Sequence, residues 1–235
     1  MVKDYFYTST LKSIPIFLIT LCLGNILNIA ELGGTESRNP LELYGGKIEF
    51  QVYREGKKAG FHTIEFSGEP NNLKVISKFN LSIKLLFITA YSFDYESHSI
   101  WKDGLLSRLQ VNVNDNGDVF FLSATRVRNK MLISRENSKY QSDIPLFPTN
   151  HWNASVLNQT VVLNTLTGEL NRVKIRDKGE ETILSENGPI VARHYAYTGD
   201  LETQIWYDNK GRWVGMEFVG SDGSRIQYRC KSCVK

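Results

Sequence analysis

Hydrophobic and polar side chains alternate along much of the chain with a period of two. Between residues 73 and 87 the apolar side chains stand at odd positions, and the even positions carry mainly Lys, Asn and Ser. The odd row consists of Leu73, Val75, Phe79, Leu81, Ile83, Leu85 and Phe87, and it continues at Tyr91, Phe93, Tyr95 and Trp101. A period of two over this length excludes a helix and predicts long strands with one apolar face.

Turn signals separate the alternating segments at regular intervals. A first strand is expected over residues 47–53, where Ile48, Phe50 and Val52 share one face. Asp103-Gly104 and Asn116-Gly117 are hairpin-type dipeptides, and glycines recur every 9 to 12 residues from Gly168 to Gly223. Strands joined this tightly pair with their sequence neighbours. The pattern therefore predicts an all-β fold, an antiparallel meander of about a dozen strands curved into a barrel-like or half-barrel sheet.

A curved sheet of this kind lines its concave side with residues of one parity. Such an interior is either a filled core or a cup that holds an apolar ligand, and both alternatives are open at the sequence level. The segment 85–90, apolar on both faces, is typical of the lip of a cup. The residues that would line the cup are Phe79, Leu81, Ile83, Leu85, Phe87, Tyr91, Phe93 and Trp101.

The N-terminus has the pattern of an export signal. Residues 14–23 are strongly apolar, with Lys3 and Lys12 before them and the small Gly24 after them. This predicts a secretory signal peptide over 1–30, with a membrane anchor through residues 14–30 as the alternative. Residues 31–44 are polar and broken by glycines, so we expect a flexible tether, followed by a single all-β domain over 45–235. The expected location is the periplasm or the exterior of a bacterium.

Composition and cysteine usage agree with an exported globular domain. The 235 residues are 41% hydrophobic and carry a net charge of +3, which is too small to indicate a nucleic-acid partner. Membrane contact is expected only through the N-terminal segment. Cys230 and Cys233 form a C-x-x-C pair near the C-terminus. Outside a reducing compartment such a pair favours a local disulfide, and the redox and zinc contexts of this motif are missing from the sequence around it.

No common catalytic or cofactor motif is found in the sequence. There is no G-x-S-x-G, no phosphate-binding loop, no G-x-G-x-x-G and no H-E-x-x-H, and the four histidines are far apart. We therefore expect no cofactor and no metal. His151, in a proline-rich break over 142–155, and His194, on a strand, are the weak catalytic candidates. A structural explanation exists for each histidine. His151 would belong to a capping segment in which Trp152 plugs the core, and His194 would be a strand residue with a satisfied hydrogen bond.

The order of several short motifs resembles a family of exported bacterial proteins, domain of unknown function 6134. The motifs are Gly60-x-His62, Lys84-x-Leu86-Phe87, Trp101-x-Asp103-Gly104, His151-Trp152-Asn153, Arg193-His194-Tyr195 with Gly199-Asp200-Leu201, and Trp206-Tyr207-Asp208 before Gly211-Arg212. The resemblance spans residues 44–228 and implies an exported all-β envelope protein. It implies no catalytic residue, because the activity of the family is unknown.

These observations favour a noncatalytic envelope protein that binds or carries an apolar or lipid-like ligand. A second hypothesis is a hydrolase-like enzyme with a histidine general base, which requires His151 and His194 to converge in one polar cleft. A third is a structural protein that interacts with another envelope protein.

Overall fold

The computed structural model describes residues 39–85, 88–136 and 138–233, with the side chains of residues 84–88 left undescribed. The chain divides into two compact units, residues 1–34 and 35–235, and every described residue belongs to the second unit. The expected signal or anchor segment, the first part of the expected tether, Phe87 and the side chain of Leu85 lie outside the described residues.

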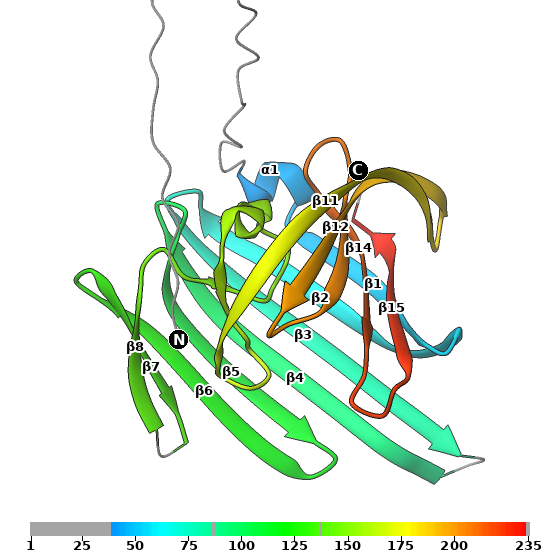
Figure 1. The fold of residues 1–235 in the computed structure, drawn as a ribbon, viewed down its shortest axis with the longest axis horizontal. Helices are drawn as coiled ribbons and strands as arrows, with labels where there is room; N and C mark the ends of the chain where they lie inside the picture. The colour runs from blue at the N-terminus through cyan, green and yellow to red at the C-terminus, as the bar shows by residue number, and fades with distance from the viewer. Residues whose placement is uncertain (1–38, 86–87, 137, 234–235) are drawn as a thin grey trace, which may run out of the picture. The chain divides into compact units, whose positions relative to one another are not determined.

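The described residues form one predominantly antiparallel β-sheet (Figure 1). Its order is β8-β7-β6-β5-β4-β3-β2-β1-β15-β14-β13-β12-β11-β10-β9, and only β9 and β10 pair in parallel. The strands are β1 (Lys47–Arg54), β2 (Lys57–Glu69), β3 (Asn72–Leu85), β4 (Ile88–Lys102), β5 (Leu105–Asp115), β6 (Asp118–Val127), β7 (Lys130–Arg135), β8 (Ser138–Asp143), β9 (Phe147–Pro148), β10 (Val161–Leu163), β11 (Leu170–Ser185), β12 (Gly188–Gly199), β13 (Thr203–Tyr207), β14 (Trp213–Val219) and β15 (Arg225–Ser232). The predicted all-β meander is confirmed. The sheet has 15 strands rather than about a dozen, because strands as short as β9 and β10 leave no alternation in the sequence.

The two-residue period places the apolar row on the concave side of the sheet. Leu73, Val75, Tyr95 and Trp101 are all buried, with exposed fractions of 5% or less, whereas the even-numbered Lys74 is exposed. β1 behaves in the same way, with Ile48, Phe50 and Val52 at 0 to 1% exposure. Burial of these alternate side chains is the main stabilisation available to such a sheet.

Two of the hairpin turns follow from their dipeptides. Asp103 and Gly104 have φ angles of 51° and 75°, and Asn116 and Gly117 have φ angles of 52° and 106°. Positive φ at both central residues is the geometry whose twist matches that of antiparallel strands. The predicted hairpins β4–β5 and β5–β6 are therefore confirmed.

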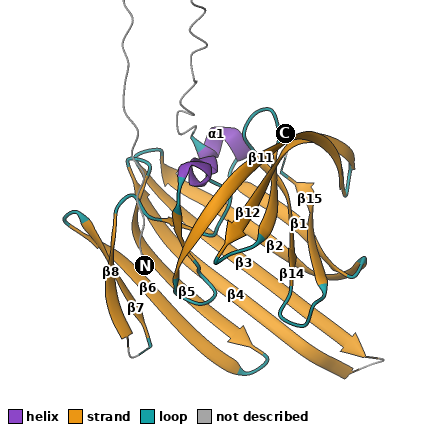
Figure 2. Cartoon of the chain, in the orientation of Figure 1, coloured by secondary structure: helices purple, strands orange, loops and turns teal. Residues whose placement is uncertain are grey.

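The sheet is strongly curved but not closed. The Phe79 ring on β3 stacks on the Tyr228 ring on β15, with centroids 5.7 Å apart, although β2 and β1 separate these strands in the sheet. Figure 2 shows the broad layer of β3 to β6 with β11 to β15 in front of it. The two ends of the sheet are β8 and β9, so the barrel remains open between them.

The long proline-containing break crosses one end of the concave side. It holds the short 3-10 helix η1 (Ala154–Asn158), and it buries Leu146, Phe147, Trp152 and Val156 in the main core. Trp101 packs edge-on against Trp152, with ring centroids 5.1 Å apart. The break together with η1 (residues 142–158), called the plugging segment below, therefore fills this end of the half-barrel, the plugged end, as the structural explanation for Trp152 requires.

Residues 40–44 differ from the tether that we expect there. They form helix α1 (Pro40–Tyr44), whose first turn is capped by the Asn39 side chain. Tyr44 is 3% exposed and its ring stacks on Phe66 at 5.5 Å. A polar stretch with glycines carries no periodic signal for such a short helix, which packs on the core through the buried Tyr44 and the partly buried Leu41 and Leu43.

Cys230 and Cys233 are joined by a disulfide, with their Cα atoms 5.7 Å apart. Cys230 lies on β15 and is 1% exposed. The predicted local disulfide is confirmed.

Candidate ligand-binding interior

The apolar row predicted to line a cup is buried to different degrees along its length. Leu81 and Trp101 are buried, at 6% and 3% exposure. The side chains of Phe79, Ile83, Tyr91 and Phe93 share the same face but are only partly buried, and they pack against the core. The plugged end at Trp101 is therefore filled, and toward the β3–β4 tip the concave wall is partly open, except at Leu81.

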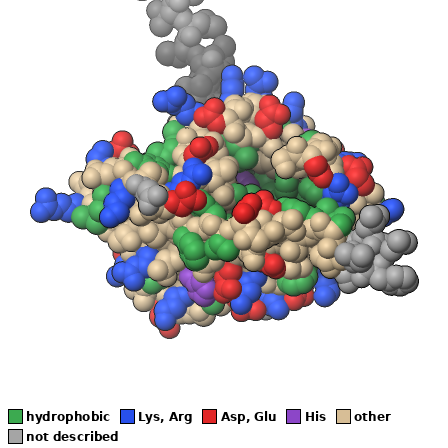
Figure 3. Space-filling view, turned by 90° about the horizontal axis from the view of Figure 1, so that it is seen from below, with side chains coloured by type: hydrophobic (Ala, Val, Ile, Leu, Met, Phe, Trp, Pro, Cys, Tyr) green, Lys and Arg blue, Asp and Glu red, His purple; other side chains and the backbone are tan. Residues whose placement is uncertain are grey.

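The open wall carries a layer of aromatic rings that packs on the core. The Phe79 ring is 5.7 Å from both the Phe93 ring and the Tyr228 ring, and Phe218 on β14 is 6.2 Å from Tyr228. Figure 3, seen from below, shows a hollow with hydrophobic side chains on its wall and one histidine inside it. The partly buried part of the concave wall is therefore rich in aromatic rings.

His62 lies immediately behind the aromatic layer. Its ring is 5.9 Å from Phe79 and 5.4 Å from Tyr228. Nε2 is 2.7 Å from the hydroxyl of Ser77, and Nδ1 is buried without a hydrogen-bond partner. Burial, with a smaller contribution from His151, lowers the pKa of His62 to about 3, so the imidazole is neutral near pH 7.

His151 lies on the plugging segment, on the other side of Trp213. Its ring is 5.8 Å from Trp213 and 5.4 Å from Tyr197, and its carbonyl accepts a hydrogen bond from Tyr207 at 2.7 Å. Nδ1 has no partner, and burial lowers the pKa of His151 to about 3. This ring is also neutral near pH 7.

Further polar groups continue from the two histidines into the same interior. The Tyr95 hydroxyl donates to Asn150 Oδ1 at 3.2 Å, and Asn150 Nδ2 donates to Ser97 Oγ at 3.5 Å. All of these residues are buried. The concave side thus has an aromatic outer zone and an uncharged, hydrogen-bonding inner zone.

His194 lies on the opposite face of its strand. Its ring stacks on Trp206 at 4.8 Å, Nδ1 is 3.1 Å from Glu181, and Nε2 is 2.6 Å from Gln204 Oε1. In the register of β12 and β13, Tyr195 pairs with the fully buried Ile205, so the neighbouring His194 points away from the core. The structure therefore does not bring His151 and His194 into one cleft, as the enzyme hypothesis requires.

Two grooves are found elsewhere on the described residues. One, of about 370 Å³, lies at the plugged end and is lined by residues that include Trp101, Asp103, Gly104, Trp152 and Asn153. The other, of about 660 Å³, lies between the start of β8 and the start of β11 and is lined by Arg135, Ser138, Tyr140, Gly168, Glu169, Leu170, Asn171 and Asp200. Two of the motifs on which the family resemblance rests thus meet at the plugged end.

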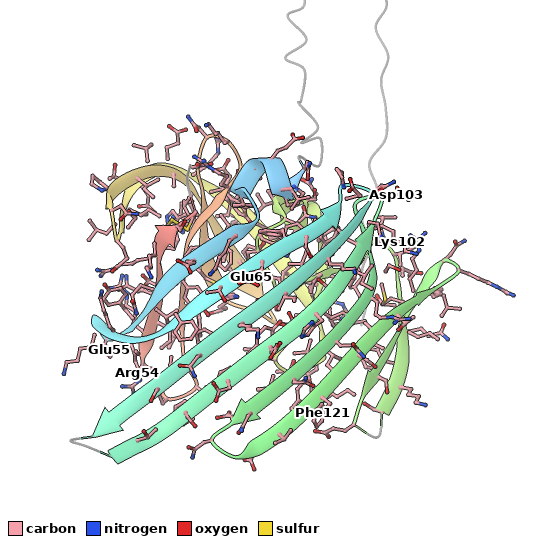
Figure 4. All side chains as sticks on the ribbon, turned by 180° about the vertical axis from the view of Figure 1, so that it is seen from behind. Arg54, Glu55, Glu65, Lys102, Asp103 and Phe121 are labelled. Carbon is pink, nitrogen blue, oxygen red and sulfur yellow. A yellow bond between two sulfur atoms is a disulfide. The ribbon has the colours of Figure 1, made fainter. Side chains whose placement is uncertain are left out.

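Figure 4 shows Glu65, Lys102 and Phe121 on the outer, convex face of the sheet. Among the described residues, no group of three His, Cys, Asp or Glu side chains is placed to hold a metal ion. No helix in the described ranges is long and apolar enough to cross a bilayer.

The polar inner zone was not predicted from the sequence, although a signal for it exists. Ser77 and Ser97 interrupt the apolar odd row, and His62 has the parity of the buried Ile64 and Phe66. A polar residue at a core-facing position of a strand indicates a buried hydrogen bond. The partner residues come from other strands, so the pattern alone does not identify the cluster.

Fold and interior together define an open, barrel-like antiparallel β-sheet protein with an aromatic concave wall. The chain belongs to the family described as domain of unknown function (DUF6134), whose profile matches residues 50–231. The resemblance stated from the motifs is thus confirmed.

A solved structure with a similar fold is the beta-barrel-like protein of domain of unknown function DUF1849 from Brucella abortus. The two share 10% sequence identity with a TM-score of 0.55, over 78% of this chain and 94% of that chain. The similarity supports the fold alone. No curated protein sequence matches the chain.

Proposed function

We propose that the protein is exported and binds an apolar or lipid-like ligand in the hollow of its half-barrel, without catalysing a reaction. The observation that carries the proposal is the partial exposure of Phe79, Ile83, Tyr91 and Phe93 on the concave face. Inward-facing apolar side chains that stay accessible leave a free-energy gain for any apolar molecule that covers them.

Export is supported by two features. The N-terminal sequence has the order of a signal peptide, and the Cys230–Cys233 disulfide is of a kind that persists in oxidising compartments. Mass spectrometry of the protein from its native host tests this proposal. The expected mature chain lacks residues 1–30 or slightly fewer, and a cytoplasmic chain of full length would contradict it.

Ligand binding is tested by fluorescence titration with N-phenyl-1-naphthylamine, an apolar probe that brightens when it leaves water. Solvent extraction of protein purified without detergent, followed by mass spectrometry, is the direct complement. We expect saturable probe binding, weakened at least tenfold in Phe93→Asp, because a carboxylate on the wall makes the hollow polar.

The matched control is Phe121→Asp on the convex face, where the ring is 59% exposed. It adds the same charge to the neighbouring part of the sheet and should leave probe binding unchanged. Circular dichroism verifies that both variants fold. Absence of saturable binding in the wild-type protein, or an equal loss in both folded variants, would refute the proposal and favour a structural role in the envelope.

A further inference from the structure

The interior changes in chemical character with depth. Its outer zone is aromatic, made by the rings of Phe79, Phe93, Phe218 and Tyr228. His62 is in ring contact with both Phe79 and Tyr228, so the polar inner zone starts directly behind these rings. A molecule that entered from the open side with an apolar chain along the rings would bring its other end to Nδ1 of His62, which is buried, once the Phe79 or Tyr228 ring moved aside.

His62 offers a hydrogen-bonding position that the protein itself leaves unused. The residue is 7% exposed, its Nε2 is paired with Ser77, and its buried Nδ1 has no partner. A buried polar atom without a hydrogen-bond partner destabilises the folded protein, because it has lost its contact with water. A ligand group that hydrogen-bonds Nδ1 relieves this destabilisation, whereas a purely apolar ligand does not.

The surroundings of His62 favour an uncharged head group. The only charged side chains buried among the described residues are Asp208 and Arg212, which form an ion pair with each other. No buried cation in this part of the chain therefore compensates a carboxylate beside His62, and no buried anion compensates an ammonium group. An unpaired charge is far more costly to bury than a hydroxyl group with a hydrogen-bond partner.

The open side also disfavours anionic ligands. Tyr91, on the exposed part of the wall, lies near the carboxylates of Asp115 and Asp222. Burial of the ring, followed by these two carboxylates, raises the pKa of its phenol. Asp222 is paired with Arg54. The remaining acidic side chain beside the apolar wall, Asp115, repels an incoming carboxylate head group.

The length of the wall fits a single chain of moderate size. Beyond Phe79, the described concave side chains of β3 continue to Ile83, a distance of about 13 Å at about 3.3 Å per residue, which accommodates an extended acyl chain of about a dozen carbons.

We propose that the hollow selects an amphiphile with one acyl chain and an uncharged, hydroxyl-bearing head group of the monoacylglycerol type, with the head group hydrogen-bonded to Nδ1 of His62 and the chain along the aromatic layer. This inference rests on the proposed function, since it names the class of ligand for the same hollow.

The test compares head groups on one chain length. Bound N-phenyl-1-naphthylamine is displaced with 1-dodecanoylglycerol, dodecanoate or dodecyltrimethylammonium, each below its micellar concentration, at pH 7.5. We expect the glycerol ester to displace the probe at a concentration at least tenfold lower than either charged amphiphile. Equal displacement by the three, or preference for a charged one, would overturn the inference.

The variant His62→Phe tests whether His62 causes the preference for the glycerol ester, because phenylalanine keeps an aromatic ring and lacks the hydrogen-bonding nitrogens. The variant should still bind the probe and should lose the preference for the glycerol ester. The control is His98→Phe, which alters an exposed histidine on the convex face. This variant should keep the preference for the glycerol ester. A folded His62→Phe protein that retains the preference would refute the role of His62.

The outcomes separate the two proposals. A wild-type protein that does not bind the probe contradicts the proposed function itself. Probe binding without a head-group preference contradicts only the inference about the ligand class. If His62→Phe fails to fold, the wild-type series still decides whether the hollow prefers an uncharged head group.

Discussion

At the scale of single residues, burial controls the chemistry of the interior histidines. His62 and His151 are each surrounded by aromatic rings, and neither ring has a charged partner that would favour the imidazolium form. Each therefore stays neutral in the folded protein, with a pKa of about 3. In the unfolded chain the same groups titrate near pH 6.5.

This difference predicts acid sensitivity. Between pH 6.5 and pH 3 the unfolded chain binds protons at these histidines and the folded protein does not, so the free energy of unfolding falls as the pH falls. Each histidine contributes about 1.4 kcal/mol per pH unit in this window.

Urea unfolding at a series of pH values measures the effect. The pH dependence of the free energy of unfolding in His62→Phe should be shallower than that of the wild type by about one proton. An unchanged slope in His62→Phe would show that this histidine is charged in the folded protein.

At the scale of elements, close approach of two strands explains one of the glycines. Gly60 on β2 pairs with Leu81 on β3. A Cβ atom at residue 60 would overlap the carbonyl oxygen of Asn80 and lie 2.9 Å from the Cα of Leu81. Both are backbone atoms, so no side-chain rotation relieves the overlap. Gly60 is needed here for its lack of volume.

Gly60→Ala is therefore expected to destabilise the protein by about 3 kcal/mol or more, because β2 and β3 must separate locally. Gly56→Ala is the comparison, since Gly56 has a φ of 74° but no heavy atom within 4 Å of the position that a Cβ atom would occupy, and its cost should stay near about 1 kcal/mol. Thermal unfolding of the two variants measures the difference. Similar losses of stability would indicate that the strands can move apart freely.

At the scale of the whole described unit, one tyrosine connects three separate parts. The Tyr44 hydroxyl, at the end of α1, donates to the carbonyl of Trp152 on the plugging segment and accepts from the backbone N–H of Trp213 on β14, both at 2.9 Å. The Tyr44 hydroxyl therefore links α1, the plugging segment and the sheet, in addition to the contacts of Trp152 and His151 with the strands.

Tyr44→Phe leaves a buried donor and a buried acceptor without partners, at a cost of about 2–4 kcal/mol. Tyr197→Phe is the matched control, because the buried hydroxyl of Tyr197 has no partner, and its removal should be neutral or stabilising. Urea unfolding compares the two, and hydrogen exchange should show faster opening of residues 149–158 in Tyr44→Phe alone. Equal effects of both substitutions would contradict this role of Tyr44.

Local pattern determined the fold class of this protein. The odd row from Leu73 to Trp101 and the dipeptides Asp103-Gly104 and Asn116-Gly117 act between neighbours in sequence, and an antiparallel meander consists of such neighbours. The Cys230–Cys233 pair is local in the same sense. These features were predictable because each depends on residues a few positions apart.

The tertiary structure decided how the interior is divided. The sequence placed Phe79, Phe93 and Trp101 on one face, but only the curvature of the sheet buries Trp101 beneath the plugging segment and leaves Phe79 and Phe93 partly exposed. The polar inner zone joins His62, Ser77, Ser97, Asn150 and His151 from four different segments. Contacts between residues this far apart depend on how the strands curl and where the break folds, and no local period encodes either.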